Sequence, residues 1–276
     1  MVIQHNIAAI NSYRNLSTNQ SALSKNLEKL SSGYKINRAG DDAAGLAISE
    51  TMRSQINGLN QAVNNANDAI GLIQTAEGAM TETHSMLQRM KTLATQAANG
   101  TYTKTARDNI KAEIDALNKE ITRIATTTEF NGEKPLSPDT KTKGKNLTFF
   151  IGASADASNA MTVAQMTMTA AALTIDKIAV DNTTNAFKAM KSIDAAIEKV
   201  STYRATLGAA QNRLEHTVNN LKVTSENITS AESRIRDTDM ADEITAYTKN
   251  NILLQAAQSM LSQSNAMPQG VLSMLQ

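Results

Sequence analysis

The sequence predicts a mainly α fold: a long antiparallel coiled-coil-like helical bundle with a small β-hairpin insertion, flanked by N- and C-terminal helices that pair with each other. Three observations predict it. Apolar residues recur at steps of three and four through most of the 276 residues, which is the spacing of one helix face. Hydrophobic residues make up 41% of the chain but aromatic residues only 3%, which suits thin seams between helices. The three prolines, Pro135, Pro138 and Pro268, leave residues 1–134 without a helix breaker.

The first segment predicts one helix followed by a joint. Its apolar seam steps alternately by three and four residues through Tyr13, Leu16, Gln20, Leu23, Leu27 and Leu30. The joint spans residues 31–42 and ends with Asp41 and Asp42. Adjacent carboxylates diverge by about 100° on a helix, so they do not predict a metal site. We expect them to cap the next helix and to complement its N-terminus, with Arg38 as the candidate ion-pair partner.

Two further helices are predicted in the middle of the chain. The seam of the first one runs through Met52, Ile56, Leu59, Val63, Ala66, Ile70, Ile73, Met80 and Leu87. This helix stops near Asn99-Gly100, a plausible left-handed C-terminal cap. Thr103 and Thr105 are the candidate caps of the next helix. The seam of that helix is Ile110, Ile114, Leu117, Ile121 and Ile124.

The pattern changes between about residues 130 and 175, where we expect a small β-hairpin region. Residues 147–151 and 161–169 are rich in strand-forming side chains, and the stretch 155–159 between them resembles a turn. A hairpin of this size is not stable alone in water, so it must pack on the helices.

A helix over residues 186–235 gives the longest periodic pattern in the chain. Such a helix needs partners along its length, and the helices at 46–98 and 105–127 are the obvious ones, which predicts an antiparallel bundle. A joint follows at residues 237–239, and a last helix runs from about residue 242 to residue 265. We expect Pro268 to interrupt this helix.

The two terminal helices are more apolar than one helical partner can cover. The N-terminal helix places Ile3, Ile7 and Ile10 beside the seam that holds Leu16, Leu23, Leu27 and Leu30. The C-terminal helix has two stripes, one with Ile244, Leu254, Leu261, Leu272 and Leu275, the other with Leu253, Met260 and Val271. Soluble monomers avoid large exposed apolar areas, so both ends are predicted to be polymerisation surfaces. The alternative is that both stripes fold back on the central bundle.

Composition excludes several other functions. With 27 basic against 26 acidic residues, no basic field predicts a nucleic-acid or anionic-membrane partner. The chain has no cysteine and three scattered histidines, so neither a catalytic triad nor a cofactor or metal site is expected. No window approaches the ~18 apolar residues of a membrane span. The N-terminus lacks a basic cluster before an apolar block, so we expect export without a cleaved signal peptide.

Several motifs identify a family resemblance. The run at 30–48 (LSSGYKINRAGDDAAGLAI), the stretches AANG at 97–100 and EFNG at 129–132, and ESRIRDTDMA at 232–241 resemble those of bacterial flagellins. Residues 133–182 leave room for the hairpin only, which implies a short form lacking the large outer variable domains. The hook–filament junction protein is the alternative within the same class. A signalling coiled coil, such as a chemoreceptor hairpin, would need neither the double-striped ends nor the β-hairpin.

The resemblance implies a structural subunit that self-assembles into the helical flagellar filament, the extracellular propeller for swimming. It implies that residues 1–42 with 237–276 form the inner filament core and that residues 43–236 form the outer bundle. It also implies type III export, a flagellar secretion chaperone on the C-terminal helix, a filament cap protein and a hook-associated junction protein as partners.

Three residues of the outer bundle are singled out by the same resemblance. Arg89, Leu93 and Glu113 match positions at which the flagellin-sensing Toll-like receptor contacts flagellins. Arg89 and Leu93 are spaced four residues apart, and both are expected beside the buried seam rather than on it. The alternative role for all three is contact between subunits in the filament wall.

Overall fold

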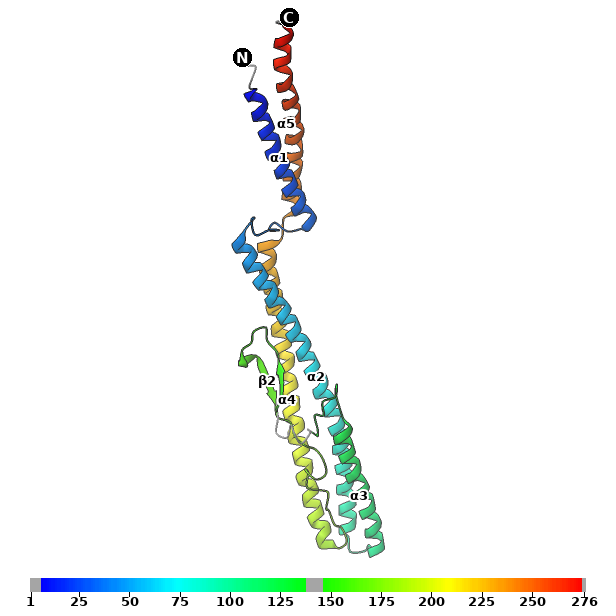
Figure 1. Ribbon diagram of the computed structural model, residues 1–276. Coiled ribbons are helices and arrows are strands. Elements are labelled where there is room, and N and C mark those ends of the chain that lie inside the picture. Colours follow the sequence, from blue (N-terminus) through cyan, green and yellow to red (C-terminus); the bar gives the residue numbers. More distant parts are fainter. Residues whose placement is uncertain (1–5, 138–145, 275–276) are drawn as a thin grey trace. The chain divides into compact units, whose positions relative to one another are not determined.

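The computed structural model describes residues 6–137 and 146–274 (Figure 1). The elements in chain order are α1 (Ile7–Ser32), α2 (Ala43–Ala98), α3 (Lys104–Thr127), β1 (Leu147–Phe150), η1 (Ala157–Asn159), β2 (Ala160–Val163), α4 (Thr183–Arg236) and α5 (Met240–Met274). The predicted fold class is confirmed. The described part of the chain contains five α-helices, α1 pairs with α5, and the two strands form one antiparallel hairpin.

The chain divides into two compact units. The terminal unit comprises residues 1–54 with 226–276, and the central unit comprises residues 55–225. Because α2 and α4 are long, each contributes residues to both units. None of the helices in the described ranges combines the length and the apolar character that a bilayer crossing requires.

The helix ends follow from local chemistry. The Asn6 side chain caps α1 by accepting a 3.0 Å hydrogen bond from the Ala9 N–H. At the other end Gly33 adopts φ 77°, which glycine reaches without steric cost, and its N–H donates to the Lys29 carbonyl. Thr103, one of the two predicted caps of α3, accepts from the Ala106 N–H. These contacts satisfy donors and acceptors that each helix leaves free at its ends.

In the central unit α2 and α4 run antiparallel. The ion pairs Lys91–Asp194 and Glu77–Arg204 show this, because residue numbers rise along α2 as they fall along α4. The predicted seams supply much of the core, although the buried faces are wider than one seam. Fully buried residues of the core include Ile73, Met80, Leu87, Met90, Ile114, Ile121, Ile193, Val200 and Leu214.

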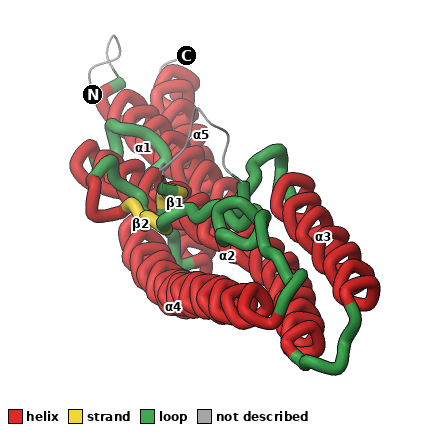
Figure 2. The backbone as a smooth tube through the Cα atoms, turned by 90° about the horizontal axis from the view of Figure 1, so that it is seen from below, coloured by secondary structure: helices red, strands yellow, loops and turns green. Residues whose placement is uncertain are grey.

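An irregular segment, residues 164–182, packs on the helices of this unit (Figure 2). The prediction of a strand through residue 169 is wrong, because β1 offers only four residues and Val163 already pairs with its first, Leu147. After Val163 the backbone forms hydrogen bonds with segments other than β1. Met168 N–H donates to the Leu136 carbonyl at 2.8 Å, and the Leu173 and Ile175 side chains are buried.

The predicted interruption of the last helix at Pro268 is also wrong, since α5 continues to Met274. Proline has no N–H, so the Ser264 carbonyl, four residues earlier, loses its helical donor. The side-chain amide of Asn6 donates to that carbonyl at 2.8 Å. An interhelical hydrogen bond therefore replaces the missing intrahelical one.

Candidate assembly surface

In the terminal unit α1 and α5 lie side by side (Figure 1), and the contact between them is nearly half polar. Residues at alternating three- and four-residue steps form the less exposed stripe on each helix. On α1 they are Ala9, Ser12, Leu16, Asn19, Leu23, Asn26 and Leu30, and on α5 they are Tyr247, Asn250, Leu254, Ala257, Leu261 and Ser264. Only Asn26 and Ser264 among them are buried. The apolar members of the stripe stay partly accessible, so the pair alone lacks a closed hydrophobic core.

The two buried polar residues add little stability to this contact. The Asn26 Nδ2 and the Ser264 Oγ have no hydrogen-bond partner within the described ranges. A buried polar group without a partner costs about 1–3 kcal/mol. These two groups therefore lower the stability of the α1·α5 contact.

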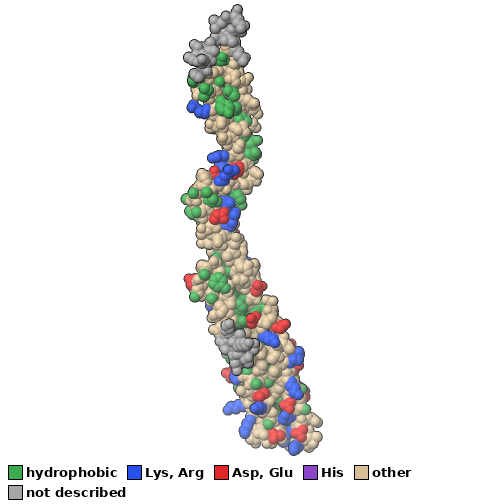
Figure 3. Space-filling model, viewed as in Figure 1, with side chains coloured by type: hydrophobic (Ala, Val, Ile, Leu, Met, Phe, Trp, Pro, Cys, Tyr) green, Lys and Arg blue, Asp and Glu red, His purple; other side chains and the backbone are tan. Residues whose placement is uncertain are grey.

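Outside this stripe both helices expose large apolar side chains. Ten are between 41% and 64% exposed: Ile7, Ile10, Tyr13, Leu27, Met240, Ile244, Ile252, Leu253, Met260 and Met267. The face drawn in Figure 3 shows hydrophobic side chains and few charged ones over α1 and α5. From Asn250 to Gln276 the sequence has no charged residue. This combination is typical of a surface that another protein covers.

The structure divides the predicted polymerisation residues between the two faces. Those that face the partner helix are Leu16, Leu23, Leu30, Leu254 and Leu261. Those that are exposed are Ile7, Ile10, Leu27, Ile244, Leu253 and Met260. The seam drawn from Tyr13 to Leu30 is therefore split, with every second member turned to solvent. Ile3 and Leu275 lie outside the described residues, as do the side chains of Val271 and Leu272.

The joint of the terminal unit is held by Arg236. Its Nη1 lies 2.6 Å from Glu50 Oε1, and its guanidinium carbon lies 4.6 Å from the centroid of the Tyr34 ring. The Arg236 carbonyl accepts from the Lys35 N–H at 2.8 Å, and the Thr238 N–H donates to the Gly33 carbonyl at 3.0 Å. A cation stacked on an aromatic ring and paired with a carboxylate favours arginine over lysine.

Asp41 and Asp42 have different partners. Asp42 Oδ1 accepts from the Gly45 N–H at 2.9 Å, the geometry of a helix N-cap. Asp41 Oδ2 instead accepts from the backbone N–H groups of Arg38 and Asn37, and these bonds hold the pKa of the Asp41 carboxyl below its ordinary value. The Arg38 guanidinium pairs with Glu28 at 2.8 Å rather than with either aspartate.

In the central unit Arg89 on α2 and Glu113 on α3 form an exposed ion pair, with Nη2 and Oε1 2.8 Å apart. Leu93, expected beside the buried seam, is only 2% exposed and belongs to the core. The reason is that α2 packs on both α3 and α4, so its buried face is broader than one stripe. Arg89 and Glu113 are available to a partner, while the Leu93 side chain is buried in the core.

Two features of the terminal unit were not predicted. The role of Asn6 depends on a residue 258 positions away, so no local pattern indicates it. The same holds for the pairing of Glu50 with Arg236. The uncharged stretch from Asn250 onward is a sequence signal that indicates a covered surface on α5.

Two family models match the chain. The bacterial flagellin N-terminal helical region matches residues 3–141, and the bacterial flagellin C-terminal helical region matches residues 190–275. A flagellin of Bacillus subtilis (strain 168) is 52% identical over 303 aligned residues, and a flagellin of Halalkalibacterium halodurans is 47% identical over 275. Both alignments cover the whole of both chains.

Solved structures agree with these matches. The crystal structure of Bacillus cereus flagellin is 33% identical with a TM-score of 0.50, and the alignment covers 61% of this chain and 94% of that one. A putative flagellar hook-associated protein from Vibrio parahaemolyticus has a TM-score of 0.58 over 71% of this chain and 100% of that one. At 12% identity the second likeness shows a shared fold alone.

Proposed function

This chain belongs to the bacterial flagellin family, the structural subunits of the flagellar filament, and we propose that its α1·α5 pair is the polymerisation surface that forms the inner tube of that filament. The chain serves motility as a structural protein and is not an enzyme. In this proposal residues 1–42 with 237–276 form the inner domain, and residues 43–236 form the outer wall.

The observation that carries the proposal is the exposed apolar surface of α1 and α5. Fully burying one Leu, Ile or Met side chain stabilises a protein by about 1.5–3 kcal/mol. Nine such side chains and that of Tyr13 are exposed by roughly half on the described parts of the two helices. Covering them with neighbouring subunits would contribute on the order of 10 kcal/mol per subunit, before the costs of association are subtracted. A weak α1·α5 contact within the chain is consistent with this, because assembly supplies the missing burial.

The same surface accounts for the partners that the family implies. We expect a flagellar secretion chaperone on residues 237–276, because the uncharged part of α5 from Asn250 onward, with exposed Leu253, Met260 and Met267, would otherwise aggregate before export. A filament cap protein would assist insertion at the tip, and a hook-associated junction protein would contact the first subunits. The location we propose is extracellular, reached by type III export.

Arg89 and Glu113 form a second proposed contact surface. Their side chains are 55% and 44% exposed and are already paired, so a partner meets an ordered charge pair and pays little to fix it. Contact between subunits in the filament wall and recognition by the flagellin-sensing Toll-like receptor both fit this surface, with Leu93 as its buried support. Charge reversal of both residues, Arg89→Glu with Glu113→Arg, keeps the ion pair and separates the two roles. Filaments that still form but no longer activate the receptor would indicate receptor recognition, and loss of filament formation would indicate contact between subunits.

Seeded polymerisation followed by electron microscopy tests the main proposal. The full chain should elongate the seeds into long tubes, and a chain of residues 43–236 should not. Equal elongation by the truncated chain would show that α1 and α5 are not the assembly device. Circular dichroism of the truncated chain controls for loss of its helices.

A further inference from the structure

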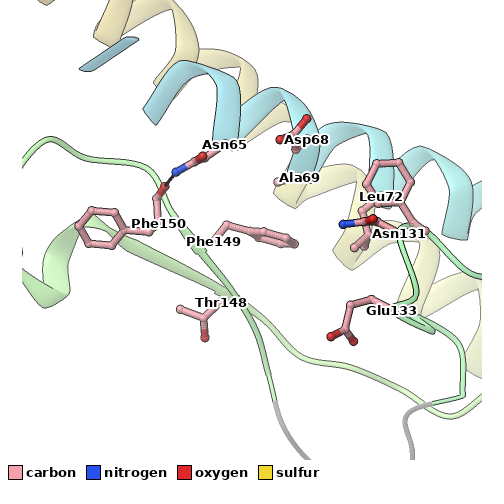
Figure 4. A pocket seen from close by; sticks show the side chains of 10 residues that line it. Asn65, Asp68, Ala69, Leu72, Asn131, Glu133, Thr148, Phe149 and Phe150 are labelled. Carbon is pink, nitrogen blue, oxygen red and sulfur yellow. Dashed lines mark hydrogen bonds between the residues drawn. The ribbon is translucent and has the colours of Figure 1, made fainter. Parts of the chain in front are cut away.

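A cavity of about 500 Å³ lies in the central unit between α2, the turn that follows α3, and β1 (Figure 4). Asp68 on α2 and Glu133 after the turn stand on either side of the Phe149 ring from β1 (Figure 4). The cavity belongs to neither the α1·α5 surface nor the Arg89–Glu113 pair. It is therefore a feature that filament assembly by the terminal helices leaves unexplained.

The walls of the cavity are fixed by specific local chemistry. Asn131 and Gly132 adopt φ values of 51° and 84°, the left-handed pair of a tight two-residue turn. The turn is closed by two backbone hydrogen bonds between Phe130 and Glu133, of 2.9 and 3.0 Å. The side-chain amide of Asn65 donates to the Phe150 carbonyl at 3.0 Å and so connects β1 to α2.

A glycine on α2 completes this arrangement. A Cβ at Gly71 would meet the Phe130 ring at 3.5 Å, so the ring lies close against the helix backbone at a position without a side chain. The turn, strand β1 and helix α2 are thus each held by contacts within the chain, so the cavity is preformed in the absence of a ligand.

The chemistry of the lining points to a positively charged ligand. Three of the four phenylalanines in the chain line the cavity, together with the carboxylates of Asp68 and Glu133, and no basic residue of the described ranges does. Neither carboxylate has an ion-pair partner in the described part of the chain. Aromatic faces attract cations, and unpaired carboxylates add to that attraction.

We propose that this cavity binds an organic cation, a primary ammonium or a guanidinium group on an aliphatic stem. The stem lies against Phe130 and Phe149, and the charged group is stabilised by Asp68 and Glu133. Two sources share this chemistry: a free small amine, and a lysine or arginine side chain of a neighbouring copy of the chain. The site does not depend on the proposed role of α1 and α5, because it is complete within one monomer.

Titration of the full-length monomer with Nα-acetyl-lysine methylamide, followed by NMR of ring-labelled phenylalanine, tests the proposal. Nα-acetyl-norleucine methylamide is the neutral control of similar shape. We expect saturable shifts with the lysine probe and affinity weaker by at least about fivefold with the norleucine probe. Equal binding of the two probes, or no saturable shift with the lysine probe, would overturn the proposal.

Matched variants locate the binding. Asp68→Asn combined with Glu133→Gln, and separately Phe149→Leu, should each weaken binding of the lysine probe by about fivefold or more. The controls are Asp108→Asn, an exposed carboxylate on α3, and Phe187→Leu, the one phenylalanine outside the cavity. If the controls weaken binding as much as the cavity variants, the cavity is not the site.

Filaments distinguish the two sources. Loss of probe binding on assembly identifies a side chain of the neighbouring subunit as the ligand, and retained binding that still needs Asp68 and Glu133 identifies a free amine. Binding to filaments that ignores the Asp68→Asn, Glu133→Gln change would contradict the cavity as a cation site. The monomer titration stands whether or not α1 and α5 prove to drive assembly, so the two proposals fail separately.

Discussion

The side-chain amide of Asn6 donates a 2.8 Å hydrogen bond to the backbone carbonyl of Ser264, the group that Pro268 deprives of its helical donor. The same side chain caps α1 through its oxygen, which accepts from the Ala9 N–H. Asn6 therefore caps the N-terminus of α1 and also supplies the hydrogen-bond donor that the Ser264 carbonyl of α5 lacks. This double role gives α1 and α5 a fixed register near their ends.

Replacing Asn6 by alanine should weaken the α1·α5 contact by about 1–2 kcal/mol, since both the cap and the interhelical bond are lost. In a Pro268→Ala background the loss should be smaller, because an alanine at this position has the backbone N–H that proline lacks and can donate it to the Ser264 carbonyl. Hydrogen exchange of the α1 amides in the full chain measures both effects.

Asn6→Asp is the matched control for this pair, because it keeps the capping oxygen and removes only the donor. In the Asn6→Asp chain the N-cap of α1 should remain, and the effect of the substitution should no longer depend on whether residue 268 is proline or alanine. Strictly additive effects of Asn6→Ala and Pro268→Ala would mean that the Ser264 bond contributes nothing to the contact.

Arg236→Lys should loosen the joint even though the positive charge remains. A lysine ammonium does not reproduce the planar stack on Tyr34 together with the bond to Glu50, and the Arg236 side chain is only 12% exposed. We expect a loss of about 1–2 kcal/mol, measured as faster hydrogen exchange of residues 33–38. Arg234→Lys, at an exposed position two residues earlier, should change exchange there little, and an equal effect of both variants would rule out the specific role of Arg236.

Tyr203→Phe should leave the stability unchanged or raise it slightly. The Tyr203 ring is buried in the core, and its hydroxyl lies beside the Met166 backbone without a well-formed hydrogen bond in the described part of the chain. Removing such a hydroxyl costs less than about 1 kcal/mol. Urea unfolding of the two chains at neutral pH gives the comparison, and a loss of about 2 kcal/mol or more would mean that the hydroxyl is bonded.

The same tyrosine predicts a difference at high pH. Burial raises the pKa of Tyr203 above its ordinary value of 10.0, so above that pH the unfolded chain releases a proton that the folded chain keeps. Stability should therefore fall as the pH rises above about 10, and the Tyr203→Phe chain should show less of this fall. Parallel pH profiles of the two chains would contradict the assignment.

The Asp41 carboxylate should make the stability of the joint depend on pH in the acidic range. Backbone hydrogen bonds from Arg38 and Asn37 lower its pKa, so its contribution is present at neutral pH and is lost as the pH falls through that lowered pKa. Asp41→Asn should remove this acid dependence from the exchange of residues 37–41. Asp108→Asn, in the central unit, should leave it in place.

Much of this architecture is predictable because the apolar periodicity is nearly continuous. The helix predicted over residues 186–235 is α4, Thr183–Arg236, and Thr103 is one of the two predicted caps of α3. Errors arose where the outcome depends on a distant residue. Asn6, which donates to the carbonyl that Pro268 leaves without a helical donor, lies 258 residues away, and the end of β2 follows from the length of β1.

The candidate site shows the same division. Periodicity shows that the terminal helices have more apolar positions than one helical partner can cover. It does not assign each position to the paired or the exposed face, because that assignment requires the position of the second helix. Leu93 was misplaced for the related reason that a helix with two partners buries two adjacent stripes. The cavity beside Phe149 joins residues from three separate segments, and no spacing in the sequence indicates it.

Seeded polymerisation of the Leu253→Gln, Met260→Gln chain tests the role of the exposed α5 stripe most directly. Both residues face away from α1, so the monomer should keep its helical content while seed elongation, followed by electron microscopy and light scattering, nearly stops. Met166→Gln, an exposed methionine of the central unit, should elongate seeds like the unchanged chain. Elongation of the Leu253→Gln, Met260→Gln chain at the unchanged rate would contradict the assignment of α1 and α5 as the polymerisation surface.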